Sequence, residues 1–279
     1  LGITAATLML MKINIGALYS AAAFWIVLNC NILTSPKAKY NSSIRLITEI
    51  GTVLLPWALM KKHLAEYWGI AYAAEVSLGL AAFFLICRMP QEHNISIKTK
   101  SSLKNNSIAL FILSLFLTAV LFLGLTIRTG STLFDIIQSV VIVPHRHSNV
   151  LTVPLFFPKW TFAWILFGLG LAGLAFYTKR SVYFYAGKLL LTLSAFGSFL
   201  GILKASPFVY LPPFLWAVAE SDRKNKFQRQ SLILIGLLQI LHAYPIAGSQ
   251  KGWALFIAGL LLVLNFDDKK IKNKRIYVL

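Results

Sequence analysis

The chain has 279 residues, of which 57% are hydrophobic and 13% charged, and its formal net charge at pH 7 is +18. Its mean hydropathy of +0.71 excludes a water-soluble globular protein. Because a membrane-spanning helix needs about 20 mostly apolar residues, the composition predicts an all-α fold, a polytopic transmembrane helical bundle. The basic excess is then typical of loops beside anionic lipid, and we expect no nucleic-acid partner.

Ten apolar segments follow one another along the chain, and we expect about nine to ten of them to form the bundle. They are 1–11, 13–33, 46–60, 64–87, 107–127, 160–178, 181–203, 207–219, 231–247 and 253–266. Several are short. Segment 207–219, with three prolines, is expected to tilt little, to thin the bilayer or to be a broken helix buried against its neighbours.

The connections between these segments alternate in basic content. One set of connections carries 18 Lys and Arg, and the set on the opposite side carries eight. The more basic set comprises 34–45, 88–106, 179–180, 220–230 and the tail 267–279. The positive-inside rule therefore predicts a multi-pass protein of the plasma (inner) membrane with a cytoplasmic tail. We divide the chain into transmembrane helices at 1–127, an outer loop at 128–159, and C-terminal transmembrane helices with the basic tail at 160–279.

One turn departs from this pattern. Lys61, Lys62 and His63 fall on the outer side, so either a flanking segment does not span or these lysines have a function. The cysteines Cys30 and Cys87 are too few for a disulfide framework or a thiolate metal site. The chain begins with Leu1 and an apolar run without a basic leader, and we expect that an N-terminal part is missing.

The outer loop 128–159 combines an amphipathic segment with a polar cluster. Apolar residues from Leu133 to Val141 recur at helical spacing, and Ser131 or Thr132 is expected to cap a short interfacial helix. The following His145, Arg146 and His147 are suited either to clamping an anionic ligand or to contacting lipid headgroups. No metal site is assigned there, because only Asp135 is at hand as a third ligand.

A second outer turn runs from His242 to Lys251. Its Pro245 and Gly248, followed by Gln250, are typical either of an anion-binding helix start or of a tight hairpin between two spans. His242 itself is expected to be buried with a hydrogen-bond partner.

Three carboxylates lie within or near the apolar segments. Glu49 and Glu66 are near segment ends, where we expect them either to reach water or to pair with Arg45 and Lys62. Glu75 is the deepest of the three, and an ionisable group inside a span is a functional candidate.

Three short motifs resemble bacterial membrane proteins of the C-class glycosyltransferase superfamily: Met11–Gly16, the Leu55-Pro56-Trp57 run and Tyr244–Gln250. The resemblance implies transfer of a sugar from a polyprenyl-phosphate donor to a lipid or glycan acceptor on the outer face. It also implies that the catalytic carboxylate lies upstream of Leu1, in a first outer loop, so no catalytic residue is assigned here.

The resemblance implies that outer cations contact the donor phosphate, whose charge grows as the glycosidic bond breaks. The candidate substrate-binding residues are Lys12, Lys61, Lys62, Arg128, His145, Arg146, His147, Gln250 and Lys251. No cofactor is assigned and a divalent metal is left open; the expected partners are membrane lipid and the polyprenyl-phosphate-linked sugar. The alternative is a non-catalytic transporter or flippase of lipid-linked glycans, or a scaffold in envelope assembly.

Overall fold

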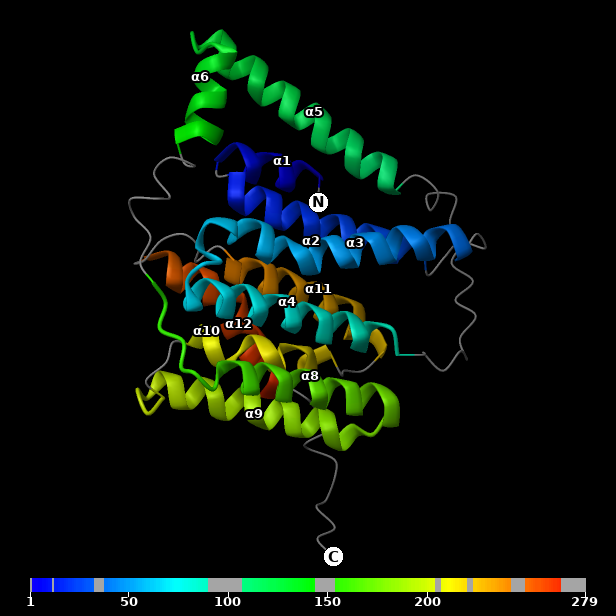
Figure 1. The fold of residues 1–279 in the computed structure, drawn as a ribbon. Helices are drawn as coiled ribbons and strands as arrows, with labels where there is room; N and C mark the ends of the chain where they lie inside the picture. Colours follow the sequence, from blue (N-terminus) through cyan, green and yellow to red (C-terminus); the bar gives the residue numbers. More distant parts are fainter. Residues whose placement is uncertain are drawn as a thin grey trace, which may run out of the picture. The chain divides into compact units, whose positions relative to one another are not determined.

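The computed structural model describes residues 2–11, 13–32, 38–89, 107–143, 154–203, 207–219, 223–241 and 249–266. Every regular element in these ranges is helical, so the all-helical class is confirmed for the described chain (Figure 1). The chain divides into two compact units. Unit 1 comprises 1–52, 90–153 and 241–253, and unit 2 comprises 53–89, 154–240 and 254–279.

Unit 1 is built around three helices, α1 (Gly2–Met11), α2 (Ile13–Ile32) and α5 (Ser107–Arg128). Their shared core is formed by small and aromatic side chains: Ala5, Ala23, Val27 and Phe111, with Tyr19, Phe24 and Leu115 packed against it. At Gly2 an added Cβ would lie 2.5 Å from the carbonyl oxygen of Phe111, so only glycine allows α1 and α5 to approach this closely.

Beyond Arg128 the chain forms the short helix expected from the sequence. Thr132 caps α6 (Leu133–Ile137), its hydroxyl accepting from the backbone N–H of Asp135 while the Asp135 carboxylate accepts from the N–H of Thr132. This reciprocal pair is a capping box, and it identifies Thr132 rather than Ser131 as the cap. The helix continues as the π-helical turn η3 (Gln138–Ile142). The hydroxyl of Thr132 also donates to the Asp135 carboxylate, and this bond, followed by that from the Thr132 N–H, lowers the pKa of the carboxyl.

Unit 2 surrounds helix α4 (Tyr67–Cys87), whose residues are mostly buried. It packs against α8 (Thr161–Thr178), the broken segment α10 (Pro207–Tyr210) with η4 (Pro212–Ala219), and α11 (Arg223–Ile240). Helix α9 (Ser181–Phe199) packs on α8 and η4. Most of α12 (Ser249–Phe266) also belongs to this unit, where Gly236 of α11 faces Ile257.

The segment 207–219 is a broken helix whose residues after Pro207 are all buried, the last of the three outcomes expected for it. Pro212 and Pro213 lack backbone N–H groups and therefore interrupt the helical hydrogen bonding. Two glycines let neighbouring helices approach the break: a Cβ at Gly79 would lie 2.9 Å from the carbonyl oxygen of Pro212, and one at Gly168 would lie 2.7 Å from that of Pro213.

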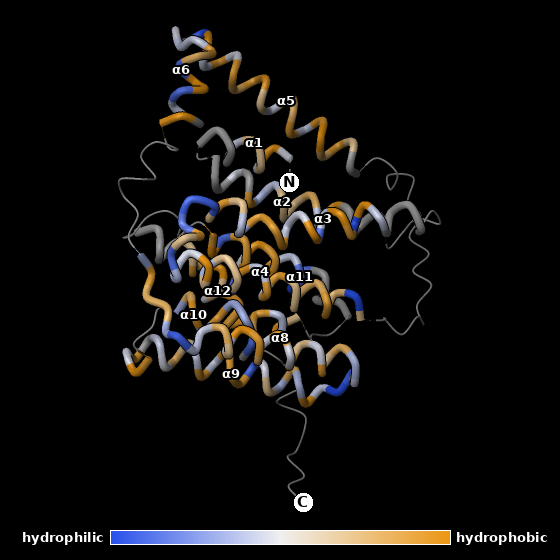
Figure 2. Tube along the Cα trace, viewed as in Figure 1, coloured by the Kyte–Doolittle hydropathy of each residue, from blue (hydrophilic) through white to orange (hydrophobic). Residues whose placement is uncertain are grey.

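Three described helices are long and apolar enough to cross a membrane: Tyr67–Cys87, Ala109–Arg128 and Thr161–Thr178. They differ in burial, because α4 is largely enclosed whereas most α5 side chains are exposed and apolar. Figure 2 shows α5 coloured hydrophobic along most of its length. Such an outward apolar surface is suited to lipid, and the structure supports membrane association through at least these helices.

Several helices extend beyond the segments expected from hydropathy. Helix α3 (Ala38–Leu59) begins eight residues before the predicted segment 46–60, and α11 begins at Arg223 rather than at 231. Four basic residues assigned to the loop 220–230 are therefore in the first turns of α11: Arg223, Lys224, Lys226 and Arg229. Lys and Arg are good helix formers, so a charged stretch can continue a spanning helix into the headgroup region.

Candidate functional site

The turn between α3 and α4 holds two of the predicted site residues. The chain leaves α3 at Met60, forms the 3₁₀ turn η1 (Lys61–His63) and enters α4 after Glu66, which has an extended backbone. Gly69 makes this turn compact, because a Cβ there would lie 2.1 Å from the carbonyl oxygen of His63. The side chains of this turn are therefore held close to the start of α4.

Glu66 is the centre of a small polar cluster in this turn. Its carboxylate accepts a hydrogen bond from the indole Nε1 of Trp68, and its Oε1 lies 3.3 Å from Nδ1 of His63. The His63 and Trp68 rings lie 5.0 Å apart between centroids, with their planes tilted by 40°. The bond from Trp68 contributes most, and that from His63 next, to lowering the pKa of the Glu66 carboxyl. Glu66 is thus held as a carboxylate at the surface.

Lys61 and Lys62 lie in the same turn and are both exposed. Two ammonium groups on adjacent residues give this end of unit 2 a local positive charge beside the Glu66 carboxylate. Since Lys side chains donate up to three hydrogen bonds each, the pair is suited to a phosphate group.

Aromatic side chains surround the start of α4. The Tyr67 hydroxyl donates a 2.8 Å hydrogen bond to the carbonyl oxygen of Pro158, which ties α4 to the segment 154–160. Trp160 in that segment lies 5.4 Å from the Tyr210 ring and 6.2 Å from the Trp164 ring, measured between centroids. The exposed Lys159 stands between Pro158 and Trp160 in sequence. We call Lys61, Lys62, Glu66, Tyr67, Lys159 and Trp160 the basic–aromatic end of unit 2.

This combination has two chemical uses. Lysines bind phosphate, while aromatic faces and carboxylates contact the C–H faces and hydroxyls of sugars. Aromatic residues at helix ends are also typical of the membrane–water interface, where their apolar bodies meet lipid and their polar atoms meet water.

The other predicted site residues belong to unit 1 or lie outside the described residues. Arg128 is exposed at the end of α5 in unit 1. Gln250 and Lys251 lie in the first turn of α12, where the structure describes only their backbone. The remaining candidates lie outside the described residues: Lys12, His145, Arg146, His147. The second outer turn from His242 to Gly248 lies outside them as well.

Of the two outcomes expected for Glu66, the structure shows a carboxylate that reaches the surface, with its side chain 51% exposed. It also identifies two contacts that the sequence does not predict, those of Glu66 with His63 and with Trp68. A histidine three residues before a carboxylate and a tryptophan two residues after it were the available signals. This spacing alone does not predict the cluster, because only the fold of the turn brings the three side chains together.

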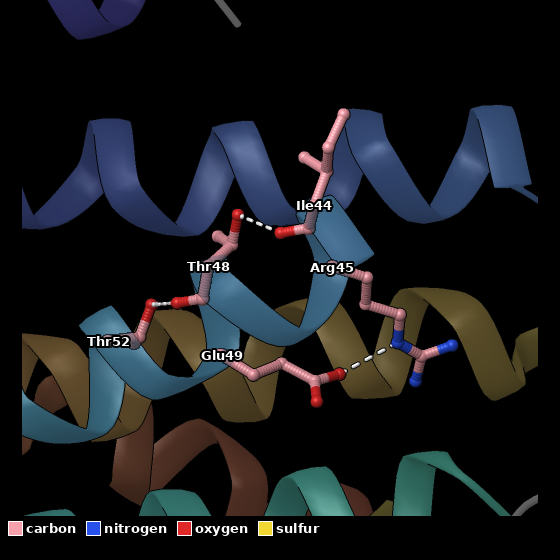
Figure 3. Close-up of polar contacts among 5 residues, drawn as sticks. All are labelled: Ile44, Arg45, Thr48, Glu49 and Thr52. Carbon is pink, nitrogen blue, oxygen red and sulfur yellow. Dashed lines mark hydrogen bonds and ion pairs between the residues drawn. The ribbon is translucent and has the colours of Figure 1, made fainter. Parts of the chain in front are cut away.

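The expected pairing of Glu49 with Arg45 is confirmed. On α3, the Arg45 Nε donates a 2.7 Å hydrogen bond to Oε1 of Glu49, one helical turn further on (Figure 3). Thr48 and Thr52 of the same helix donate their hydroxyls to backbone carbonyls one turn earlier, at 2.9 and 2.7 Å. Local pairing therefore accounts for the polar groups of this stretch without a ligand.

Within the described ranges, no group of three or more His, Cys, Asp and Glu side chains is placed to hold a metal ion. No family model matches the chain, and neither a curated protein nor a solved structure matches it.

Proposed function

We propose that the chain is an integral-membrane glycosyltransferase that takes a sugar from a polyprenyl-phosphate donor and passes it to a lipid or glycan acceptor at the outer face of the plasma membrane. The observation that carries the proposal is the basic–aromatic end of unit 2. Two exposed lysines and a carboxylate held by Trp68 and His63 lie there at the start of a helix long enough to span the bilayer.

A polyprenyl-phosphate-linked sugar presents three chemical parts. Its prenyl chain partitions into lipid, its phosphate is anionic, and its sugar has hydroxyls and apolar C–H faces. The apolar helices match the prenyl chain, and the Lys61–Lys62 pair matches the phosphate. The side chains of Glu66 and Trp160 match the sugar. In the proposed assignment Glu66 accepts hydrogen bonds from sugar hydroxyls, and Lys61 and Lys62 contact the phosphate.

The chemistry gives the lysines a role during reaction. As the acceptor oxygen bonds to the anomeric carbon, the bond from that carbon to the phosphate oxygen breaks, and its electron pair leaves with the lipid phosphate. The proton of the acceptor hydroxyl passes to a general base. Cations beside the phosphate stabilise the charge that develops on it, which accelerates the reaction more than it tightens donor binding.

The proposal is tested by binding and by transfer. The purified chain in nanodiscs is titrated with undecaprenyl phosphate and with undecaprenol, which lacks the phosphate, and is assayed with a panel of polyprenyl-phosphate hexoses and pentoses. We expect K61A/K62A to lower phosphate-dependent binding and transfer by at least about tenfold. The matched control K179G/R180A, which removes two charges at the α8–α9 turn, is expected to leave both unchanged. Equal binding of the two lipids, or transfer unaffected by K61A/K62A, would contradict the proposal.

The sidedness of the membrane protein is a separate part of the proposal. We infer that the basic connections and the tail are cytoplasmic and that the basic–aromatic end faces outward. Single cysteines at Thr129 and Ser181, both exposed, distinguish the orientations in a background without Cys30 and Cys87. An impermeant thiol reagent applied to intact cells should label the cysteine at 129 and not that at 181. The reverse pattern would invert the topology.

A second candidate function, a transporter or flippase of lipid-linked glycans, is favoured by one observation. Glu75 is fully buried within α4, and neither of its carboxyl oxygens has a hydrogen-bond partner among the described residues. A protein that only transfers sugar at the membrane surface has no need of such a group. Transport without transfer in reconstituted vesicles would favour this candidate over the enzyme.

A further inference from the structure

Glu75 lies near the middle of α4, one of the helices long and apolar enough to span the membrane. Its side chain is 0% exposed, and both carboxyl oxygens lack a hydrogen-bond partner in the part of the chain that is described. Glu49, the other buried glutamate, is paired with Arg45. Within the described residues, Glu75 therefore differs from Glu49 in having no neighbouring charge to balance an ionised carboxylate.

The face of α4 that carries Glu75 is identified by its neighbours at helical spacing. Tyr72, three residues earlier, donates its hydroxyl to the carbonyl oxygen of Ile240 at 2.5 Å. Gly79, four residues later, faces the Pro212 carbonyl and Leu237. Residues three and four apart share one helix face, so Glu75 lies on the face of α4 directed at α11 and the broken segment.

The broken segment offers a carbonyl that its own helix cannot satisfy. Val209 is buried, and the residues three and four positions after it are Pro212 and Pro213, neither of which has an N–H to donate. The next carbonyl, that of Tyr210, accepts from the Trp164 indole at 3.4 Å. Val209 therefore presents an acceptor in the interior of unit 2.

The registers of the two elements place this acceptor at the depth of Glu75. Figure 1 shows α4 and the broken segment α10–η4 running in the same direction. Gly79 is level with Pro212, because its Cβ position lies 2.9 Å from that carbonyl. Moving back four residues along α4 covers about 6 Å, and moving back three residues along α10–η4 covers about 5–6 Å. These steps lead to Glu75 and Val209.

The elements packed on α4 bring few other ionisable groups to this depth. The broken segment contributes Tyr210, and α8 contributes only Tyr177, which is 86% exposed. On α11, Arg223, Lys224, Lys226 and Arg229 all precede the uncharged half from Gln230 to Ile240. Residues 53–59 of α3 are uncharged, and Lys61, Lys62 and His63 of η1 precede α4. On α4 itself, Tyr72 is the nearest ionisable neighbour, with Tyr67 and Cys87 further away.

We propose that Glu75 and the backbone carbonyl of Val209 form an exchangeable proton-binding site inside unit 2. At rest the carboxyl carries the proton, and a rotation about its side-chain torsions allows the O–H to donate to the Val209 oxygen. On exchange the proton passes to water and leaves a carboxylate. A titratable group at this depth is what a proton-coupled membrane process requires. The site is independent of the glycosyl transfer proposed above, since it uses none of the residues of the basic–aromatic end.

Reaction with a hydrophobic carbodiimide tests the site. Dicyclohexylcarbodiimide reacts with a protonated carboxyl in an apolar environment: the carboxyl proton moves to a carbodiimide nitrogen, a carboxyl oxygen bonds to the central carbon, and rearrangement gives a stable N-acylurea. The full chain in native membranes is treated between about pH 5 and about pH 9, and the modified peptide is located by mass spectrometry.

We expect the wild-type chain to be modified at Glu75, at a rate that falls about tenfold per pH unit above the point where the proton dissociates. The matched variant E49Q should leave this labelling unchanged, and the near-isosteric E75Q should abolish it. Absence of modification at Glu75 in the wild-type chain, or a rate independent of pH over the whole range, would overturn the proposal without relying on any variant. Slowing by sodium chloride but not by choline chloride would also overturn it, in favour of a sodium ion at the same carboxylate.

Discussion

The hydroxyl of Tyr72 donates a 2.5 Å hydrogen bond to the carbonyl oxygen of Ile240, joining α4 to the last turn of α11 across 168 residues of sequence. Tyr72 is 0% exposed, and so is Ile240. The carbonyl belongs to the final turn of α11, where backbone carbonyls have no N–H donor within the helix. This one hydroxyl therefore satisfies a buried acceptor and fixes the register of two helices.

Replacing Tyr72 by Phe should destabilise unit 2 by about 1–3 kcal/mol, because the ring still packs but the buried carbonyl loses its donor. Denaturation of the purified chain in mixed micelles measures the change. The control is Tyr67→Phe: Tyr67 is exposed, and its hydrogen bond to Pro158 can be replaced by water. Equal effects of the two substitutions would show that the hydrogen bond from Tyr72 to Ile240 contributes no more to stability than the exposed one from Tyr67.

The Glu66 carboxylate should stabilise the η1–α4 turn in a pH-dependent way. Its hydrogen bonds from Trp68 and His63 lower its pKa in the folded chain, so the unfolded chain binds more protons at mildly acidic pH. The stabilisation is therefore present above the unfolded pKa and is lost as the pH falls through the lower, folded pKa. Carbon-13 NMR of labelled glutamate side chains, with E66Q to assign the signal, measures this titration.

Removing the indole donor should move that titration upward. Trp68→Phe keeps an aromatic ring beside His63 but cannot donate to Glu66, and the Trp68 bond is the largest cause of the lowered pKa. The Glu66 midpoint in W68F should therefore lie closer to that of an ordinary glutamate. An unchanged midpoint would mean that the carboxylate is held by other groups.

Gly168 and Gly170 on α8 provide a matched test of the close approach to the broken segment. A Cβ at Gly168 would lie 2.7 Å from the Pro213 carbonyl oxygen, whereas one at Gly170 would meet nothing within 4 Å. Gly168→Ala should destabilise unit 2 by about 1–3 kcal/mol, since backbone must shift to admit the methyl group. Gly170→Ala should change stability by less than about 0.5 kcal/mol. Denaturation in mixed micelles distinguishes the two, and equal effects would contradict the packing.

Hydropathy alone predicted where the helices lie, because twenty apolar residues in a row have few other structures available. The helix ends were harder. Thr132 and Ser131 are both good caps, and only the reciprocal bonds with Asp135 distinguish them. Hydropathy places Arg223 in a loop because of its charge, whereas the helix α11 begins at this residue. The burial of the segment 207–219 is one of three outcomes that its prolines and short length allow, and only the structure distinguishes them.

The candidate site was less accessible from sequence. Lys61 and Lys62 stand out in the sequence because paired lysines are typical of the cytoplasmic side, whereas the alternation of segments places them outside. Glu66 and Trp68 were not joined in advance, since two residues apart in sequence are not neighbours on a regular helix. They meet because Glu66 precedes α4 with an extended backbone, a local geometry that composition does not encode. Partners such as Ile240 for Tyr72 depend on tertiary packing over a long stretch of chain.

Lys179 at the α8–α9 turn offers a stabilising substitution. Its φ of 55° places it in the left-handed region, and its N–H bonds to the carbonyl of Ala175, as in a helix C-terminal motif that favours glycine. Lys179→Gly relieves the contact of Cβ with the backbone but adds freedom to the unfolded chain, so we expect a net gain of about 0.5 kcal/mol. Lys159→Gly, at an exposed lysine without a positive φ, should give no gain. Denaturation in mixed micelles measures both changes in the free energy of unfolding. A loss of stability in K179G would contradict the prediction, because it would show that the Lys179 side chain stabilises the fold by more than the strain of its positive φ destabilises it.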